Sequence, residues 1–362
     1  MASAVLVALA CCAFTPQHLV AHDQLGARLT NHELARPKPS LALPSTVLQA
    51  SNDAPSSFAS TSTLRSQWEG ALTLALVAVW YLASVVANQT AKSLLSSGLV
   101  TSPLLTLSQQ TVAALLGAAC IFGLNLAPFD GIGSAAQLLD MVGLAAVFSL
   151  GFTTLNACFV KMHVSLVMVL RSLEPLTTLA LSTAISPQSE RVAFRKAAAL
   201  LPVVFGCALS AVGPHAPSMS AVLAVSVCNL CFSLRGVLGK RIRRLHGTRP
   251  CSLFLQLCLV SVPLQLIALL ATSLLTGAPL PPLPPRAALT TLLLSGASFW
   301  LYVQLSWVVL ARMSAVSHSV LNSLRRPVTI AAALLVAPAP LSPLNAAGIA
   351  LACGAALVYG LL

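Results

Sequence analysis

Four arginines fall inside long apolar stretches of this 362-residue chain: Arg171, Arg235, Arg325 and Arg326. On membrane-insertion scales a charged residue at the centre of a helix costs about 2.5–3.5 kcal/mol, so together they represent roughly 10 kcal/mol, comparable with the net stability of a whole protein. Arg235 lies near the end of its stretch and can reach the surface. Glu174, one helical turn after Arg171, can neutralise one charge, which leaves about three without a partner.

Arginine in such a setting favours an anion that has several oxygens. Its planar guanidinium donates to two oxygens at once and stays charged at any physiological pH. The side chains of Arg325 and Arg326 leave their helix about 100° apart, so they can grip a compact ligand from two sides. We therefore expect a doubly charged, phosphate-bearing ligand; the alternative is a purely structural network of charges.

Membrane helices must hold these arginines, because the composition excludes an ordinary water-soluble fold. Charged residues make up only 8% of the chain and hydrophobic residues 57%, whereas soluble domains are about 25% charged. A bilayer core of ~30 Å needs about 20 apolar residues per span, and the sequence predicts an all-α membrane protein with ten transmembrane helices. The expected spans are residues 70–91, 104–125, 136–158, 163–185, 197–213, 219–239, 252–276, 287–311, 316–337 and 343–362.

The loop charges and a faint repeat predict how these spans are arranged. Ten Lys and Arg residues are Arg65, directly before the first span, and nine residues in even-numbered loops, whereas three lie in odd-numbered loops. Such residues collect on the side from which insertion occurs, so both termini are expected there, and the net charge of +12 needs no nucleic-acid partner. A Val-Ser…Pro-x-Thr pattern at residues 164–177 recurs at residues 316–329, which predicts two inverted five-helix repeats.

The first 66 residues are expected to be a targeting leader ahead of a ten-helix membrane domain at residues 67–362. Residues 1–13 resemble a signal peptide, with Cys11 and Ala13 at the positions that signal peptidase prefers. Residues 14–66 are transit-like, with a Ser/Thr-rich end, and are expected to be disordered. This two-part leader resembles those of plastid proteins in algae with secondary endosymbionts. The alternatives are a plain secretory leader or a disordered tail.

Several motifs together resemble the plastid phosphate translocators, the triose-phosphate/phosphate family of the drug/metabolite transporter superfamily. The resemblance runs from about Trp80 to Leu362, and its most specific motif is the segment from His318 to Arg326. The motifs are Trp80-Tyr81 with Asn88 and Lys92, Arg171-Ser172-Leu173-Glu174-Pro175 after Asn156, the stretch from Ser226 to Arg241, Tyr302-x-Gln304, and His318 to Arg326.

The resemblance implies an antiporter that exchanges inorganic phosphate for a phosphorylated metabolite across a plastid envelope membrane by alternating access, with both termini in the stroma. Arg171 then corresponds to the family's phosphate-gripping lysine, and Arg325-Arg326 to its Lys-Arg pair. The family's substrate-side arginine and tyrosine match Arg235 and Tyr302. These residues form the expected binding site, and the residues expected to line or support it are Phe152, Leu155, Glu174, Gln304 and His318.

Two departures from the family pattern bear on the substrate. Phe152 and Leu155 stand where members that carry three-carbon phosphates have a His and a Thr or Ser, so two hydrogen-bond donors are missing. Triose phosphate is therefore expected to be a better substrate than a carboxylated one such as 3-phosphoglycerate. Pro327 follows the arginine pair and should kink the ninth helix.

Other classes of function fit the sequence less well. A nucleotide-sugar antiporter of the secretory pathway is the alternative within transporters. A membrane enzyme is disfavoured because the helices hold no paired carboxylates and no activated nucleophile, and a seven-helix receptor is disfavoured by the helix count. Cys228-x-x-Cys231 has no second pair at metal spacing, so neither a metal nor a cofactor is predicted. The sequence does not indicate an oligomeric state.

Overall fold

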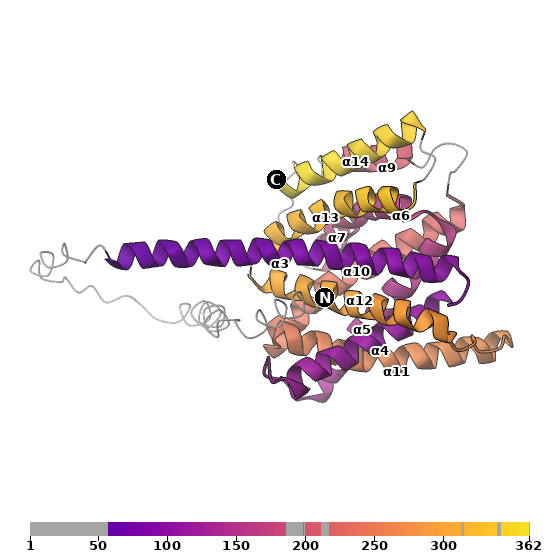
Figure 1. Cartoon of the computed structure of the whole chain (residues 1–362), viewed down its shortest axis with the longest axis horizontal. Coiled ribbons are helices and arrows are strands. Elements are labelled where there is room, and N and C mark those ends of the chain that lie inside the picture. The colour runs from indigo at the N-terminus through magenta and orange to yellow at the C-terminus, as the bar shows by residue number, and fades with distance from the viewer. Residues whose placement is uncertain are drawn as a thin grey trace, which may run out of the picture.

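The protein is a bundle of helices (Figure 1). The computed structural model describes residues 57–185, 198, 200–210, 217–312, 315–338 and 342–361, and every regular element in these ranges is helical, which confirms the all-α class. The elements are α3 (Ser57–Ser96), α4 (Ser102–Ala118), the π-helical turn η1 (Ala119–Gly123), α5 (Ala135–Lys161), α6 (Val164–Leu170), the 3-10 turn η2 (Arg171–Leu173), α7 (Glu174–Ile185), α9 (Leu201–Ser210), α10 (Met219–His246), α11 (Pro250–Thr276), α12 (Arg286–Arg312), α13 (Ala315–Val336) and α14 (Pro343–Leu361).

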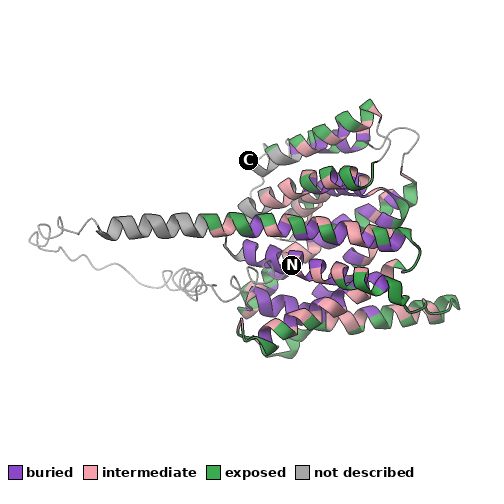
Figure 2. Ribbon diagram, in the orientation of Figure 1, coloured by how far each residue is buried: buried purple, intermediate pink, exposed green. Residues whose placement is uncertain are grey.

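Six of the described helical segments are long and apolar enough to cross a membrane. They are α3 from Ala71, α4 with η1, α5, α10, α11, and α12 as far as Val309. Their outer faces expose large apolar side chains, as a lipid-facing surface requires, while their inner faces are buried (Figure 2). The remaining predicted spans coincide with α6–α7, α9, α13 and α14. The described part of α9 has ten residues, about 15 Å of helix, so a full set of ten crossings stays a prediction.

The first helix begins earlier than the sequence predicted. We expected it near residue 70, after a disordered leader, but α3 begins at Ser57, so residues 57–66 are helical. This segment contains no Pro or Gly, and a helix that has nucleated in the apolar stretch can extend back through it at little cost per residue. Pro55 lies just before the observed start. The predicted signal peptide, residues 1–13, lies outside the described residues.

The fourth predicted span is interrupted at its centre. The 3-10 turn η2 separates α6 from α7, and its cause is Pro175, which has no N–H to donate to the carbonyl of Arg171. The N–H of Glu174 bonds to that carbonyl instead. Asn229 of α10 donates to the carbonyl of Leu170 at 3.1 Å, so a neighbouring helix satisfies a backbone group that the break has released.

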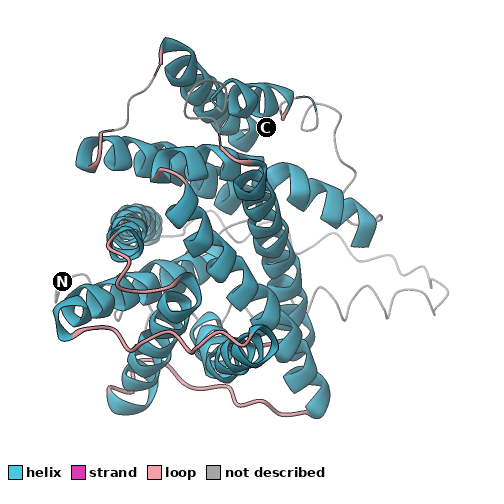
Figure 3. Ribbon diagram, turned by 90° about the vertical axis from the view of Figure 1, so that its right-hand side faces the viewer, coloured by secondary structure: helices cyan, strands magenta, loops and turns pink. Residues whose placement is uncertain are grey.

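The helices pack side by side in one bundle (Figure 3). Its central region is formed by α3, α5, α6–α7, α10, α12 and α13. α5 packs against α10 and α12 packs against α3, while α4 packs against α11 at one edge and α9 against α14 at the other. The α9–α14 pair meets backbone to backbone, because a Cβ on Gly206 would lie 2.5 Å from the nitrogen of Ala352. Small residues permit such close crossings in membranes. The two edge pairs therefore flank the central helices, which carry the four arginines, Arg171 and Arg326 buried and Arg235 and Arg325 partly buried.

Candidate substrate-binding site

A cavity of about 50 Å³ lies among the central helices. One water molecule needs roughly 10–15 Å³ of such space, so the cavity holds only a few waters in this conformation. Residues from α3, α5, α6–α7, α10, α12 and α13 contribute to its wall. The lining residues are Ser84, Asn88, Phe152, Leu155, Met168, Arg171, Glu174, Phe232, Arg235, Tyr302, Val303, Ser306, Asn322, Arg325, Arg326 and Thr329.

Glu174 bonds to two of the arginines in this wall. Its Oε2 accepts from Nη2 of Arg171 and from Nη2 of Arg326, each at 2.8 Å. The two arginines are only 5% and 3% exposed. The helix break at η2 places Arg171 and Glu174 on the same side of the turn, and Arg326 reaches them from α13. One carboxylate therefore holds two guanidinium groups in fixed positions.

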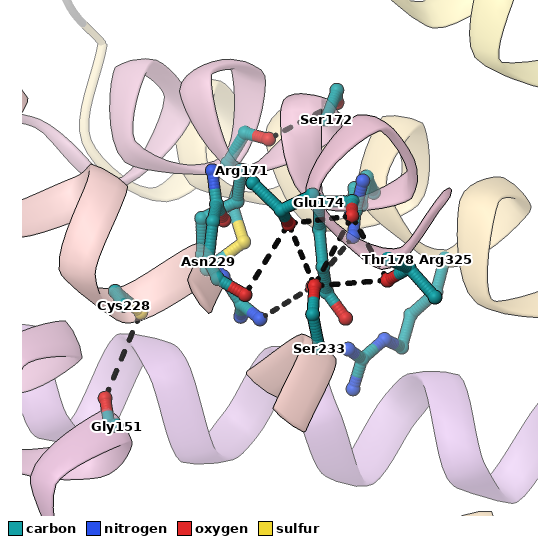
Figure 4. Close-up of polar contacts among 12 residues, drawn as sticks. Gly151, Arg171, Ser172, Glu174, Thr178, Cys228, Asn229, Ser233 and Arg325 are labelled. Carbon is teal, nitrogen blue, oxygen red and sulfur yellow. Dashed lines mark hydrogen bonds and ion pairs between the residues drawn. The ribbon is translucent and has the colours of Figure 1, made fainter. Parts of the chain in front are cut away.

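The backbone around Glu174 is fixed by a cluster of hydroxyl groups. Thr177 and Thr178 donate to the carbonyl of Glu174 at 2.8 and 3.0 Å, and Ser233 of α10 donates to it at 3.3 Å. The Ser233 hydroxyl also lies 2.6 Å from that of Thr177. Figure 4 shows Glu174, Thr178, Ser233 and Asn229 gathered around the break. These contacts tie α7 to α10 and position the carboxylate.

Arg325 points to a different part of the wall from its neighbour Arg326. Its Nη1 donates to Ser84 at 3.3 Å, and its guanidinium carbon lies 5.4 Å from the Trp80 ring and 5.6 Å from the Tyr302 ring. Asn88, one turn along α3, donates to the same serine at 3.4 Å. In the described part of the chain Arg325 thus has polar and aromatic neighbours but no carboxylate.

Arg235 lies among aromatic rings. Its guanidinium carbon is 5.4 Å from the Trp307 ring, 5.5 Å from the Phe232 ring and 6.0 Å from the Phe148 ring. Its buried Nε has no hydrogen-bond partner among the described residues. Aromatic faces attract a cation but accept few of its hydrogen bonds, so the described neighbours leave the Nε–H of Arg235 unsatisfied.

The cavity wall therefore carries four guanidinium groups and one carboxylate, a surplus of three positive charges among the described lining residues. Buried Nε of Arg171 and buried Nη1 of Arg326 also lack partners. Like charges repel strongly where water is scarce, so an arrangement of this kind calls for an anion. A cluster of three or more metal-ligating side chains is absent from the described residues.

Comparison with known proteins agrees with this chemistry. The model of the Triose-phosphate Transporter family matches residues 71–360. The chain belongs to this family. It is therefore a transporter and not an enzyme, in agreement with the resemblance seen in the motifs.

Its relatives include plastid proteins. A phosphoenolpyruvate/phosphate translocator 3 from Oryza sativa subsp. japonica is 30% identical over 79% of this chain and 73% of its own length. A triose phosphate/phosphate translocator of non-green plastids from Brassica oleracea var. botrytis is 29% identical over 78% and 71%. A solved crystal structure shares the fold with a TM-score of 0.52 at 16% identity, over 80% of this chain and 98% of that one.

The structure of the transporter brings together most of the residues that the sequence singled out. All five expected binding residues line the cavity, as do Phe152, Leu155 and Glu174. Gln304 does not: its side chain donates to Sγ of Cys251 at 3.3 Å, because it leaves α12 on another face from Tyr302, two residues earlier. The side chain of His318 lies outside the described residues.

Several lining residues escaped the sequence reasoning. Asn88 was noted only as part of the motif around Trp80, and Ser84 was not noted; they lie one turn apart on the same face of α3, and this polar i, i+4 pair inside an apolar span is a signal that could have placed both in the wall. Asn322, within the motif from His318 to Arg326, also lines the cavity. Asn156 does not line it and links two helices instead, since it donates to Thr106 of α4 at 3.0 Å.

Proposed function

We propose that this transporter exchanges inorganic phosphate for a phosphorylated metabolite, triose phosphate or a similar compound, across a plastid envelope membrane. The observation that carries the proposal is the surplus of three positive charges around one cavity, counted over its described lining residues. The names of the relatives support it, since they are chloroplastic translocators of phosphate together with phosphoenolpyruvate or triose phosphate.

Arginine suits a phosphate group in both charge and geometry. Each guanidinium can donate two parallel hydrogen bonds to phosphate oxygens. Arg171 approaches the cavity from η2, and Arg325 and Arg326 approach it from α13. A phosphate dianion reduces the surplus from three charges to one. The bound ligand therefore lowers the electrostatic cost of enclosing the site.

Obligatory exchange follows from that difference in cost. An empty site with its repelling arginines cannot easily close across the membrane, whereas a loaded site can, so only the loaded transporter changes its orientation. A ligand shifts such an equilibrium by its difference in affinity for the two states. The carrier then returns only when a second phosphate compound binds on the other side.

The pattern of helix packing supports two related halves of five helices each. When the helices of the second half, which begins with α10, are matched in order to those of the first, the contacts between the two halves occur in equivalent pairs. α5 packs against α10 as α12 packs against α3, α12 packs against α4 as α11 packs against α5, and α10 packs against α7 as α13 packs against α3. We propose that these are inverted repeats with both termini on the stromal side, as the loop charges predict.

Counter-exchange in proteoliposomes tests the proposal. Labelled phosphate should enter vesicles that contain the transporter when phosphate or triose phosphate has been loaded inside, and uptake into empty vesicles should stay near background. Loading with a nucleoside monophosphate tests the nucleotide-sugar alternative. Robust uptake into empty vesicles, or exchange with the nucleoside monophosphate alone, would contradict the proposal.

A further inference from the structure

The side chain of Trp307 crosses from α12 to α10, two helices that are not packed against each other along their described lengths. Its ring lies directly on Gly239 of α10, where a Cβ would overlap the Cη2 atom of the ring. Trp307 is 3% exposed, and its Nε1 is buried without a hydrogen-bond partner among the described residues. Shape and the missing Cβ therefore hold the ring in place, without a hydrogen bond from the indole.

This contact lies beyond the aromatic wall of the cavity, toward the C-terminal ends of both helices. Phe152 of α5 contacts Phe232 of α10 and Phe299 of α12, each at 4.8 Å between ring centres. Gly239 follows Phe232 by seven residues, and Trp307 follows Phe299 by eight. The two helices therefore run in the same direction, and the contact lies about 10–12 Å further along them. Trp307 thus stands between the cavity and the end of the bundle at which α10 and α12 finish.

Two arginines of α10 lie on either side of the contact. Arg235 lines the cavity, and its guanidinium carbon is 5.4 Å from the Trp307 ring. Arg243 lies one turn beyond Gly239. Residues four apart are turned by about 40° on a helix, so these three positions lie on one side of α10.

Arg243 has an unsatisfied donor, as the cavity arginines do. It is partly buried, and its buried Nε has no hydrogen-bond partner among the described residues. Within the same part of the chain, no ion pair joins Arg243 to a carboxylate. The positive charge of the cavity wall is therefore continued along α10, past the Trp307 ring, by a side chain that can still bind an anion.

We propose that Arg243 is a second anion-binding residue on the path of the substrate, and that the Trp307 ring on Gly239 is the barrier between it and the cavity. The path leads to the end of the bundle at which α10 and α12 finish. When the ring leaves Gly239, the path opens and water can satisfy the indole N–H. Arg243 attracts the phosphate group of an approaching substrate before the cavity arginines bind it. This inference rests on the proposed phosphate exchange and adds the residues of its access path.

Removing the ring tests the barrier. Trp307→Leu leaves a side chain too short to reach α10, so the cavity stays open at this end while the other end opens in the transport cycle. Uptake of labelled phosphate into empty proteoliposomes, which is near background for the wild type, should rise about fivefold or more. Trp300→Leu is the control, because it removes a buried ring of the same helix that lies beside Gly117 of α4. It should leave this uptake near background, whereas a folded Trp307→Leu with no rise would overturn the barrier.

A matched pair of glycine variants on α10 provides a second test if Trp307→Leu does not fold. Gly239→Ala places a methyl group where the ring lies, and overpacking of this kind costs about 1–3 kcal/mol. The displaced ring should raise uptake into empty vesicles about threefold or more. Gly236→Ala adds the same methyl group at a position with nothing within 4 Å, and its uptake should stay near background. Equal uptake by the two folded glycine variants would overturn the role of the Gly239 contact.

The role of Arg243 is tested by the phosphate concentration that gives half-maximal exchange, measured from each side of the membrane in vesicles of defined orientation. Arg243→Ala should raise this concentration about threefold from the side on which α10 ends, with no change from the other side or in the maximal rate. High salt should reduce the difference, because it screens the charge. Arg243→Gln replaces this variant if it does not fold.

The control is the next residue, Arg244, which is exposed and leaves the helix about 100° away from Arg243. Arg244→Ala should leave the half-saturating concentration unchanged from both sides. A shift of equal size from both sides in Arg243→Ala, or no shift from either, would overturn the assignment of Arg243 to the path.

The two proposals fail in different ways. If a folded wild-type transporter shows no phosphate homoexchange, the proposed function is wrong. If the wild type exchanges phosphate, but the variants of Trp307 and Gly239 fold without a leak and Arg243→Ala keeps the wild-type half-saturation, the function stands and the inferred path is wrong.

Discussion

Two regions of the molecule hold buried or partly buried charges, and they are built in opposite ways. The first is the cavity wall. The second, which we call the loop clasp, consists of Asp130 and Asp140 with Arg249 and His246. Arg249 donates to Asp130 from Nε at 2.9 Å and from Nη2 at 2.5 Å, and its backbone N–H donates at 2.8 Å. His246 lies 3.1 Å from Asp140. In the clasp each acid has its own basic partner.

The cavity has one acid for four bases, so its charges are not balanced within the described lining. Through Asp130 and Arg249 the clasp joins the segment before α5 to the start of α11, and through Asp140 and His246 it joins the first turns of α5 to the end of α10. Balanced pairs of this kind fasten loops together. The unbalanced cluster lies at a greater depth, where it is more costly, and stabilising the fold does not account for it. We conclude that, in this protein, the ratio of acidic to basic side chains distinguishes structural ion pairs from a binding site.

Glu174→Gln gives the strongest test of this contrast, because it removes the only acid among the described cavity residues. Arg171 and Arg326 then lose their shared partner, and breaking a buried pair of this kind costs about 3–5 kcal/mol. We expect a large fall in the thermal unfolding temperature of the detergent-solubilised protein. Phosphate should restore more of the stability in this variant than in the wild type, because the ligand replaces the missing negative charge.

Glu174→Asp is the matched control, since it keeps the charge on a shorter side chain. This variant should lose less stability than Glu174→Gln, and phosphate should raise its unfolding temperature by a smaller amount. If both variants unfold at the same temperature with no response to phosphate, then Glu174 acts through packing, and the view of the cavity as an unbalanced cluster is wrong.

Arg326→Ala should remove exchange rather than folding. Truncating one partner of a buried, hydrogen-bonded charge pair costs at least about 2 kcal/mol in binding and often more, so we expect phosphate homoexchange to fall by about 100-fold. Arg171 still neutralises Glu174 in this variant, and the unfolding temperature should change little. The readouts are the initial rate of exchange and a melting curve on the same preparation.

The control for this change is an arginine of the same chain outside the cavity. Arg244 is exposed near the end of α10, and Arg244→Ala should leave exchange within about twofold of wild type, as surface substitutions usually do. An equal loss of exchange in both variants would mean that general basicity, and not the cavity, governs transport.

Much of the central site could be predicted from the sequence, because charge inside an apolar span is a strong signal. The positions of Arg171, Glu174, Arg325 and Arg326 required only the cost of burial and helical geometry. Their distribution over the wall could not be predicted. Which arginine pairs with Glu174 depends on how α13 packs against α6. These two helices are far apart in the sequence, so sequence reasoning does not show how they pack.

Gln304 shows the opposite limit of sequence reasoning. It lies two residues after Tyr302 in a recognisable motif, yet two residues along a helix turn the side chain by about 200°, and it bonds to Cys251 outside the cavity. The start of α3 was missed for a related reason. Composition identifies residues 57–66 as polar, but it does not show that a helix can continue through a polar segment from its apolar part.

Asp130→Asn tests the balanced region and should have the smallest effect. Partial burial raises the pKa of Asp130, but the bonds from Arg249 outweigh it and hold the pKa below its ordinary value. A carboxyl with a lowered pKa contributes stability that is complete above its unfolded-state pKa, about 4, and is lost as the pH falls through the folded-state value. Since the Arg249 side chain is 38% exposed, we expect a contribution of about 1 kcal/mol.

The wild type should therefore unfold at a higher temperature than Asp130→Asn at neutral pH, and the difference should shrink as the pH falls below about 4. Melting curves of the two proteins over this range measure it. Because both partners of the clasp pair lie outside the cavity, exchange by the variant should remain within about twofold of wild type. A larger loss of exchange at full stability would show that the clasp opens and closes during transport, and the distinction between balanced and unbalanced charges would then fail as a guide to function.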